Sequence, residues 1–179
     1  MKKVVLFLIV LFCVTACSVK KIEEQTDAEK FAIEYGIREN NPFHYSSVDE
    51  VIRLFTEGDG ILFLGNSDGE WSKFCVKILN EAFLETKIES VSYFNLKVAE
   101  EKYPKRYQKL SKKIKESLKE DEKLQTPALF FIRDGKVVSY SLDYEHITKG
   151  NKEGYQKKEQ KKLKNKYIQL IKEYQKEDV

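Results

Sequence analysis

The chain has 179 residues, and 34% of them are charged, yet its formal net charge is only +3. Because Lys and Arg nearly balance Asp and Glu, the chain offers no strongly basic domain for neutralising phosphates, and nucleic acid is not expected as a partner. The length allows one domain with a hydrophobic core of its own.

The N-terminus has the pattern of an export signal. Lys2 and Lys3 precede an apolar segment, residues 4–14, that is shorter than an ordinary membrane-spanning helix. The sequence VTAC follows and resembles the bacterial lipobox, in which the cysteine is acylated and becomes the mature N-terminus. We therefore expect residues 1–16 to be a lipoprotein signal peptide and Cys17 to carry the lipid. A plain secretory signal with a nearby cysteine is the alternative.

The number of cysteines limits the redox chemistry that the chain can perform. Of its three cysteines, Cys13 is expected to leave with the signal peptide and Cys17 to be acylated. Cys75 then remains as a lone thiol, so no disulfide is expected within the mature chain, although an extracytoplasmic compartment permits disulfides.

The first predicted elements follow a polar tether. Residues 17–26 are predicted to be this lipidated tether, and residues 27–179 one domain. Thr26 and Glu29 have the spacing of a capping box and predict a helix that ends near Gly36.

Further elements are predicted from hydrophobic periodicity, glycines and prolines. In chain order they are a short strand within 41–45, a helix from a second capping box (Ser47 and Glu50) to Gly58, a buried strand at 60–65, a helix from about 71 to 83, a strand at 88–96, a long lysine-rich helix (104–120) opened by Pro104 within a helical segment 97–123, a hairpin of strands 128–132 and 136–140, and a closing helix around 163–174.

This order, with Thr126 and Pro127 directly before a core strand, resembles the thioredoxin superfamily over roughly residues 40–176. The most specific part is the sequence TPALFFIRDGKVV (126–138). The resemblance implies a three-layer α/β sandwich, in which helices cover both faces of a mixed central sheet. It also implies a cis peptide bond before Pro127.

The resemblance places a degenerate redox loop after the central strand. Family members carry Cys-x-x-Cys there, and some extracellular relatives of bacteriocin transport accessory proteins read Cys-Pro-Trp-Cys. Aligning Trp71 with that tryptophan puts Gly69 and Ser72 at the cysteine positions and Glu70 between them. Phe63 stands where many thioredoxins bury an aspartate as proton acceptor. The resemblance thus implies a redox site that has lost both thiols and its proton relay.

Cys75 is the one candidate for remaining thiol chemistry. It shares a helical stripe with Ile78, Leu79 and Ala82, which predicts a buried, inert thiol. The alternative is a shifted loop that exposes Cys75, which would then act as a monothiol oxidoreductase or react with peroxide.

Other polar residues are given structural roles. Asp68 and Glu70 lie at the start of the predicted helix, where capping explains them. His44 and His146 are the only histidines, and neither has metal-ligand spacing, so neither a metal nor any other cofactor is predicted.

The function favoured by the resemblance is that of a module without redox activity, which binds peptides or proteins or assists secretion. In the family, the loop tryptophan and the backbone before the cis-proline hold extended peptides, and Trp71, Thr126 and Pro127 keep that surface. The expected partner is an exported polypeptide or a membrane protein. We expect the lipid to anchor the module to the outer face of a bacterial membrane, and the resemblance points to a Gram-positive bacterium. A third hypothesis is a structural subunit that uses the lysine-rich helix as its interface. Alternatively, those lysines form a solvated face of the helix, or they contact anionic lipid or wall polymer.

Overall fold

A computed structural model of the chain describes residues 24–142 and 157–176. The predicted signal peptide, Cys17 and His146 lie outside these residues. Among the described helices, none is both long and apolar enough to cross a membrane.

The two capping boxes expected from the sequence both form and start the first two described helices. In α2 (Asp27–Tyr35), the backbone N–H of Glu29 donates to Thr26 Oγ1 at 3.2 Å, and the N–H of Thr26 donates to Glu29 Oε2 at 2.7 Å. Ser47 and Glu50 make the same reciprocal pair at the start of α3 (Val48–Glu57). Each pair satisfies two backbone groups that the first helical turn leaves open, so these helix starts are fixed locally.

Five strands form one mixed sheet in the order β1-β3-β2-β4-β5. Strands β1, β3 and β2 are parallel, whereas β4 is antiparallel to β2 and β5 to β4. Their bounds are β1 (Phe43–Tyr45), β2 (Gly60–Gly65), β3 (Val91–Asn95), β4 (Ala128–Arg133) and β5 (Lys136–Leu142).

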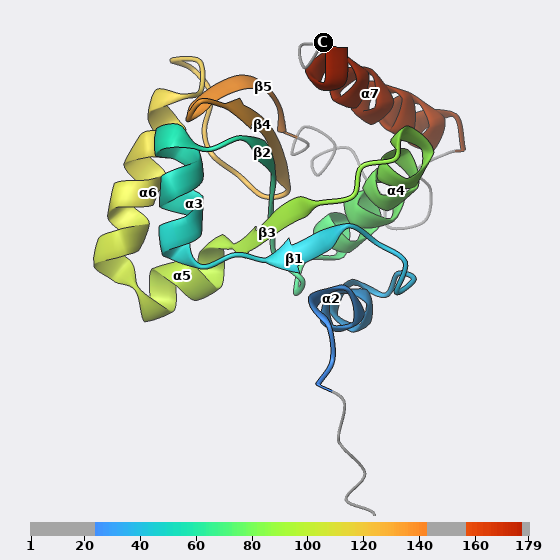
Figure 1. The fold of residues 1–179 in the computed structure, drawn as a ribbon, viewed down its shortest axis with the longest axis horizontal. Helices are drawn as coiled ribbons and strands as arrows, with labels where there is room; N and C mark the ends of the chain where they lie inside the picture. The colour runs from blue at the N-terminus through green and yellow to red at the C-terminus, as the bar shows by residue number, and fades with distance from the viewer. Residues whose placement is uncertain (1–23, 143–156, 177–179) are drawn as a thin grey trace, which may run out of the picture.

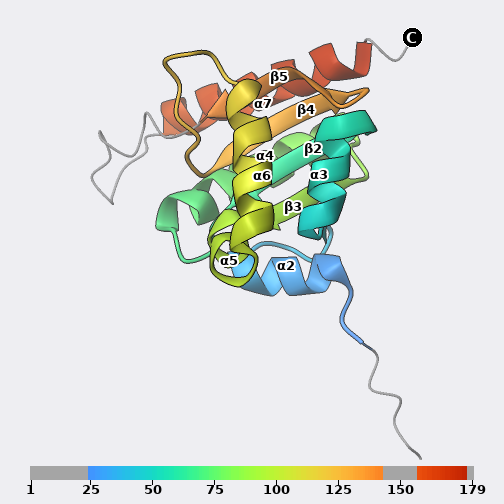
Figure 2. The same cartoon turned by 90° about the vertical axis from the view of Figure 1, so that its left-hand side faces the viewer.

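Helices cover both faces of the sheet (Figures 1 and 2), which makes three layers. One core lies between the sheet and α2, α4 (Glu70–Thr86) and α7 (Lys157–Lys176), and the other lies between the sheet and α3, α5 (Leu96–Lys102) and α6 (Pro104–Glu116). Strand β2 contributes Ile61 and Phe63 to the first core and Leu62 and Leu64 to the second. This explains its continuous apolar sequence, and the predicted thioredoxin-like α/β sandwich is confirmed as the fold class.

The start of the lysine-rich helix predicted at Pro104 is confirmed, but the helical segment expected at 97–123 is not continuous. The segment forms two helices, because the chain breaks at Tyr103, whose φ of −135° and ψ of 55° are not helical. Pro104 disfavours helical backbone at the residue before it, and it starts α6 as the first helical residue. In addition, α6 ends at Glu116 rather than near residue 120, with Ser117 as its C-cap.

The hairpin expected at residues 133–135 forms and holds β4 and β5 against α3. Asp134 and Gly135 have φ angles of 47° and 74°, the left-handed backbone that a tight two-residue turn requires. The N–H of Gly135 donates to the carbonyl of Gly58 at 2.9 Å, and a Cβ added to Gly135 would lie 2.3 Å from the Thr56 carbonyl carbon. The turn therefore accepts no side chain at this position.

Replacing Gly135→Ala is expected to lower the free energy of unfolding by about 3 kcal/mol or more, because left-handed backbone strain and a backbone clash add together. Gly36→Ala is the matched control. Gly36 also has a positive φ, 65°, but nothing lies within 4 Å of an added Cβ, so about 1 kcal/mol is expected from backbone strain alone. Urea unfolding of both variants measures the difference. Equal losses would contradict the packing of the turn on α3.

Candidate functional site at the carboxyl end of the parallel strands

The loop that resembles a degenerate redox site lies at the carboxyl end of β2, between the strand and α4. The segment Thr126–Pro127 lies at the same end of the sheet, because Leu64 near the end of β2 pairs with Ala128 at the start of β4. The Thr126–Pro127 peptide bond is cis. The topology thus places the loop and the proline segment on neighbouring strands, although they are some sixty positions apart in sequence.

The loop closes on itself through three hydrogen bonds. The N–H of Gly69 donates to the carbonyl of Asn66 at 3.0 Å, and the N–H of Asp68 donates to Asn66 Oδ1 at 3.1 Å. The N–H of Asn66 in turn donates to Ser72 Oγ at 3.4 Å. The side chain of Ser72 is buried, so its hydroxyl acts as a fixed support of the loop.

Gly69 and Ser72 lie at the separation that a disulfide requires. An ideal Cβ built on Gly69 would be 3.9 Å from the Cβ of Ser72. Disulfide-bonded cysteines have Cβ atoms about 3.5–4.5 Å apart. The Cβ separation at the two positions that the resemblance assigns to cysteines is therefore compatible with a disulfide, while the residues present supply no sulfur.

The start of α4 differs from the sequence-based expectation for Asp68. Gly69 is the N-cap and makes no side-chain capping hydrogen bond, so Asp68 does not cap the helix. Its carboxylate instead pairs with Lys97 Nζ at 3.2 Å, and both side chains are exposed. The sequence did not reveal this ion pair, because Lys97 lies on α5, and only the tertiary structure brings α5 to the loop. Glu70 is the first residue of α4 and is exposed.

Cys75 lies more than one turn into α4 and is completely buried, with 0% of its surface accessible. It belongs to the core between the sheet and α4, together with Ile78, Leu79 and Ala82, as the helical stripe predicted. A thiol in this position is out of reach of a disulfide or a peroxide in solution as long as the fold is intact.

The position that holds an aspartate in many thioredoxins is part of an aromatic cluster here. The ring of Phe63 lies 6.2 Å from that of Tyr35 and 6.1 Å from that of Tyr93. Tyr35 Oη donates to Tyr93 Oη at 3.0 Å, and Tyr93 Oη donates to Glu34 Oε1 at 2.9 Å. Burial raises the pKa of both Tyr35 and Tyr93. Both hydroxyls therefore stay protonated near neutral pH and act as hydrogen-bond donors rather than as a proton relay.

The predicted peptide-binding residues differ in exposure. Trp71 is half-buried in the first turn of α4, and its ring stacks on that of Phe74 at 5.1 Å between centroids. Thr126 is also half-buried, whereas Pro127 is buried. Trp71 and Thr126 consequently present partial surface to solvent at the end of the sheet where the loop lies.

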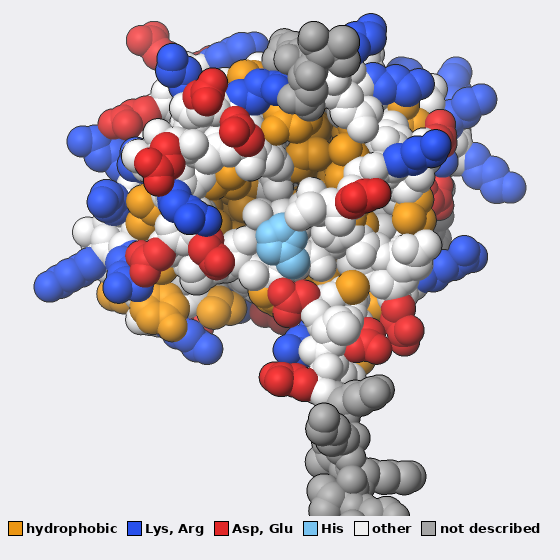
Figure 3. Space-filling model, in the orientation of Figure 1, with side chains coloured by type: hydrophobic (Ala, Val, Ile, Leu, Met, Phe, Trp, Pro, Cys, Tyr) orange, Lys and Arg blue, Asp and Glu red, His pale blue; other side chains and the backbone are white. Residues whose placement is uncertain are grey.

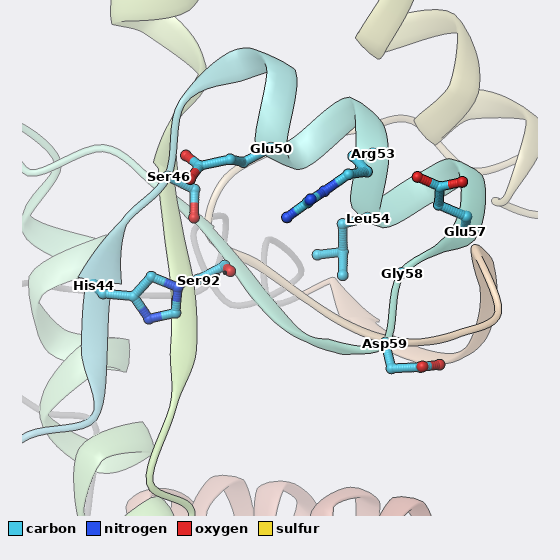
Figure 4. A pocket seen from close by; sticks show the side chains of 9 residues that line it. All are labelled: His44, Ser46, Glu50, Arg53, Leu54, Glu57, Gly58, Asp59 and Ser92. Atoms are coloured by element: carbon cyan, nitrogen blue, oxygen red, sulfur yellow. Dashed lines mark hydrogen bonds between the residues drawn. The ribbon is translucent and has the colours of Figure 1, made fainter.

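A separate polar hollow of about 540 Å³ lies between α3 and strands β1 and β3 (Figure 4). All of its lining residues except Ser92 lie within residues 44–59. Sequence reasoning missed it, because local patterns do not show how β1 and α3 face each other. His44 and Ser92 face it from the sheet, Arg53 points into it from α3, and Asp59 borders it. The one signal for this hollow in the sequence was His44, and a single histidine does not predict a binding site.

The polar groups of this hollow are largely engaged in holding the fold. His44 Nε2 and Nδ1 lie 3.2 and 3.4 Å from the hydroxyls of Ser92 and Ser90. Glu50 accepts the capping hydrogen bond of α3, which lowers its pKa, and Asp59 accepts the N–H of Asp134 at 2.7 Å. Within residues 24–142 and 157–176, no group of three or more His, Cys, Asp or Glu side chains is arranged to hold a metal ion.

Comparison of the sequence with protein-family models found no matching family, and comparison with curated proteins found no match. The fold and the geometry of the loop therefore carry the functional interpretation.

The double substitution Gly69→Cys and Ser72→Cys is expected to create a disulfide, because the two Cβ positions already have the required separation. Mass spectrometry of the oxidised protein should show the loss of two hydrogens and no labelling of residues 69 and 72. The control is Gly69→Cys alone. In a chain that begins at Ser18 it should keep its thiol, because the one other cysteine, Cys75, is buried in the core. Two free thiols at 69 and 72 after oxidation would refute the geometry.

Proposed function

We propose that this protein is an extracytoplasmic binding module with a redox-inactive thioredoxin-like domain, which holds an extended segment of an exported polypeptide or of a membrane protein. In this proposal Cys17 carries the lipid that anchors the module to the outer face of the membrane. The chemistry of a thioredoxin is absent, and its loop and its neighbouring proline segment serve for binding.

The observation that carries the proposal is a loop with a disulfide-compatible Cβ separation and no thiol. Gly69 and Ser72 have disulfide-compatible geometry, yet a glycine and a serine cannot exchange electrons with a substrate disulfide. Cys75, the remaining thiol of the described residues, is buried. A loop that keeps this shape through its own hydrogen bonds is suited to presenting a surface.

The proposed contact surface combines an aromatic side chain with the backbone beside β4. Trp71 offers a large half-buried ring, a side chain that often dominates binding energy at interfaces. The backbone at Thr126 precedes the first residue of β4, where an extended peptide can add strand-like hydrogen bonds. The ring would supply affinity, and the backbone contacts would tolerate many sequences.

The alternative of a monothiol oxidoreductase acting through Cys75 has no support from the geometry. Attack on a disulfide requires that the thiolate reach a sulfur of the substrate, and the side chain of Cys75 has no accessible surface. Such an enzyme would need α4 to separate from the sheet in each catalytic cycle.

Binding can be tested through Trp71, the single tryptophan of the chain. A chain that begins at Ser18 retains every described residue and is suited to the measurement. A reduced, carboxymethylated polypeptide without tryptophan is expected to shift the fluorescence of Trp71. In anisotropy titrations with a dye-labelled form of that polypeptide, Trp71→Ala should weaken binding at least about tenfold, as for a central interface tryptophan.

The matched control is Val138→Ala, which removes an exposed apolar side chain from the edge strand β5. Its affinity should equal that of the unchanged protein. If Val138→Ala weakens binding and Trp71→Ala does not, the peptide adds to the edge of β5 and the proposed surface is wrong.

Alkylation by iodoacetamide tests the loss of thiol chemistry. In the chain that begins at Ser18, Cys75 is the single cysteine, and the folded protein should react at least about 100-fold more slowly than the urea-unfolded protein, because labelling requires opening of the core. In the variant Gly69→Cys, the half-exposed new thiol should react readily while Cys75 does not. Rapid labelling of Cys75 in the folded protein would contradict this expectation and support the hypothesis of a monothiol enzyme.

A further inference from the structure

Helix α6 carries a strongly basic surface. Residues 102–115 contain no Asp or Glu, and their cationic side chains are Lys102, Lys105, Arg106, Lys109, Lys112, Lys113 and Lys115. Lys105, Lys109, Lys112 and Lys115 are exposed and are called the α6 basic face below. The stripe formed by Leu110 and Ile114 is buried against the sheet, so the lysines project away from the body. Figure 3 shows several blue side chains projecting from the edge of the molecule over α6.

Few carboxylates of the described residues compensate this charge. Arg106 pairs with Asp49 of α3 at 2.8 Å, and Lys112 lies 3.9 Å from Glu116 at the end of the helix. Lys105, Lys109 and Lys115 form no ion pair with any residue that the structure describes. Their charge is therefore available to an anionic partner.

Apolar and aromatic side chains border the same surface. Tyr103, at the junction of α5 and α6, is 51% exposed, and Val98 of α5 is 40% exposed. Tyr107 lies beside Lys112 and Lys115 in a shallow hollow on the flank of α6. Lysines mixed with tyrosines are characteristic of surfaces that meet the headgroup region of a bilayer, because both side chains combine an apolar part with a polar end.

Helix α7 shows that lysine content alone does not make such a surface. It is also rich in lysine, but Glu159 and Glu173 interrupt its charge. Lys164 is held by Glu81 at 3.3 Å and by Glu85 at 3.1 Å, both from α4. None of the exposed large hydrophobic side chains of the described residues lies on α7. Helix α7 therefore provides an internal control.

We propose that the α6 basic face, with Tyr103 at its end, docks on the surface of an anionic phospholipid bilayer. Each lysine that reaches such a surface strengthens binding by about fivefold, and the attraction decays over about 10 Å at 0.1 M salt. Figures 1 and 2 place α5, which leads into α6, at the same end of the molecule as α2, where the described chain begins. The proposal holds with or without a lipid on Cys17, and it is independent of peptide binding.

The test is flotation of the chain that begins at Ser18 with lipid vesicles. We expect binding to vesicles with about 30% phosphatidylglycerol in phosphatidylcholine, and none to pure phosphatidylcholine, at about 0.1 M salt. The variant Lys105→Gln, Lys109→Gln, Lys112→Gln, Lys115→Gln should bind at least about tenfold more weakly. The matched control Lys158→Gln, Lys161→Gln, Lys162→Gln, Lys172→Gln removes four exposed lysines of α7 and should bind within about twofold of the unchanged protein.

Thermal unfolding of both variants verifies that the fold is intact, and Tyr103→Ala provides a second, charge-neutral test with an expected loss of about threefold. Equal losses in the α6 and α7 variants would overturn the proposal, since binding would then follow net charge. If the protein does not bind anionic vesicles but does bind soluble poly(glycerol phosphate), the proposal is overturned in favour of a wall polymer as the partner. Trp71→Ala should leave vesicle binding unchanged, which separates this result from the peptide-binding test.

Discussion

The burial of strand β2 on both faces is the constraint on which the rest of the structure depends. Its side chains from Ile61 to Leu64 are at most 4% exposed, so the strand is stable only when helices cover the two sides of the sheet. The chain meets this requirement with α4 on one side and α3 and α6 on the other. The loop that follows β2 must then emerge at the end of the sheet, next to the start of β4.

This placement is compatible with the proposed loss of redox chemistry at the loop. The loop is held by Asn66 and by the hydroxyl of Ser72, and Phe63 and Tyr35 lie against Gly65 at the end of β2, where the loop begins. None of these contacts uses a thiol or an ionised proton acceptor. The shape of the loop is thus supported without redox-active residues, as the proposed binding function requires.

The loop and the α6 basic face are joined through α5. Lys97 of α5 pairs with Asp68 of the loop, and α5 runs on through Tyr103 to α6. The proposed peptide surface and the proposed membrane surface therefore border the same end of the molecule. A module arranged in this way would hold a polypeptide close to the bilayer.

The sequence by itself determined the features that depend on local chemistry. Capping boxes at Thr26 and Ser47, the Asp134-Gly135 turn, the apolar run of β2 and the stripe that buries Cys75 all act within a few residues. They predicted individual helices, strands and buried positions, whereas the three-layer sandwich was implied by the resemblance to the thioredoxin superfamily. The tertiary structure alone decided what depends on packing between distant segments: the pairing of Asp68 with Lys97, and the polar hollow at which Ser92 of β3 meets β1 and α3. Periodicity and turn propensity operate over one or two turns of backbone, whereas these features require the sheet to bring separate elements together.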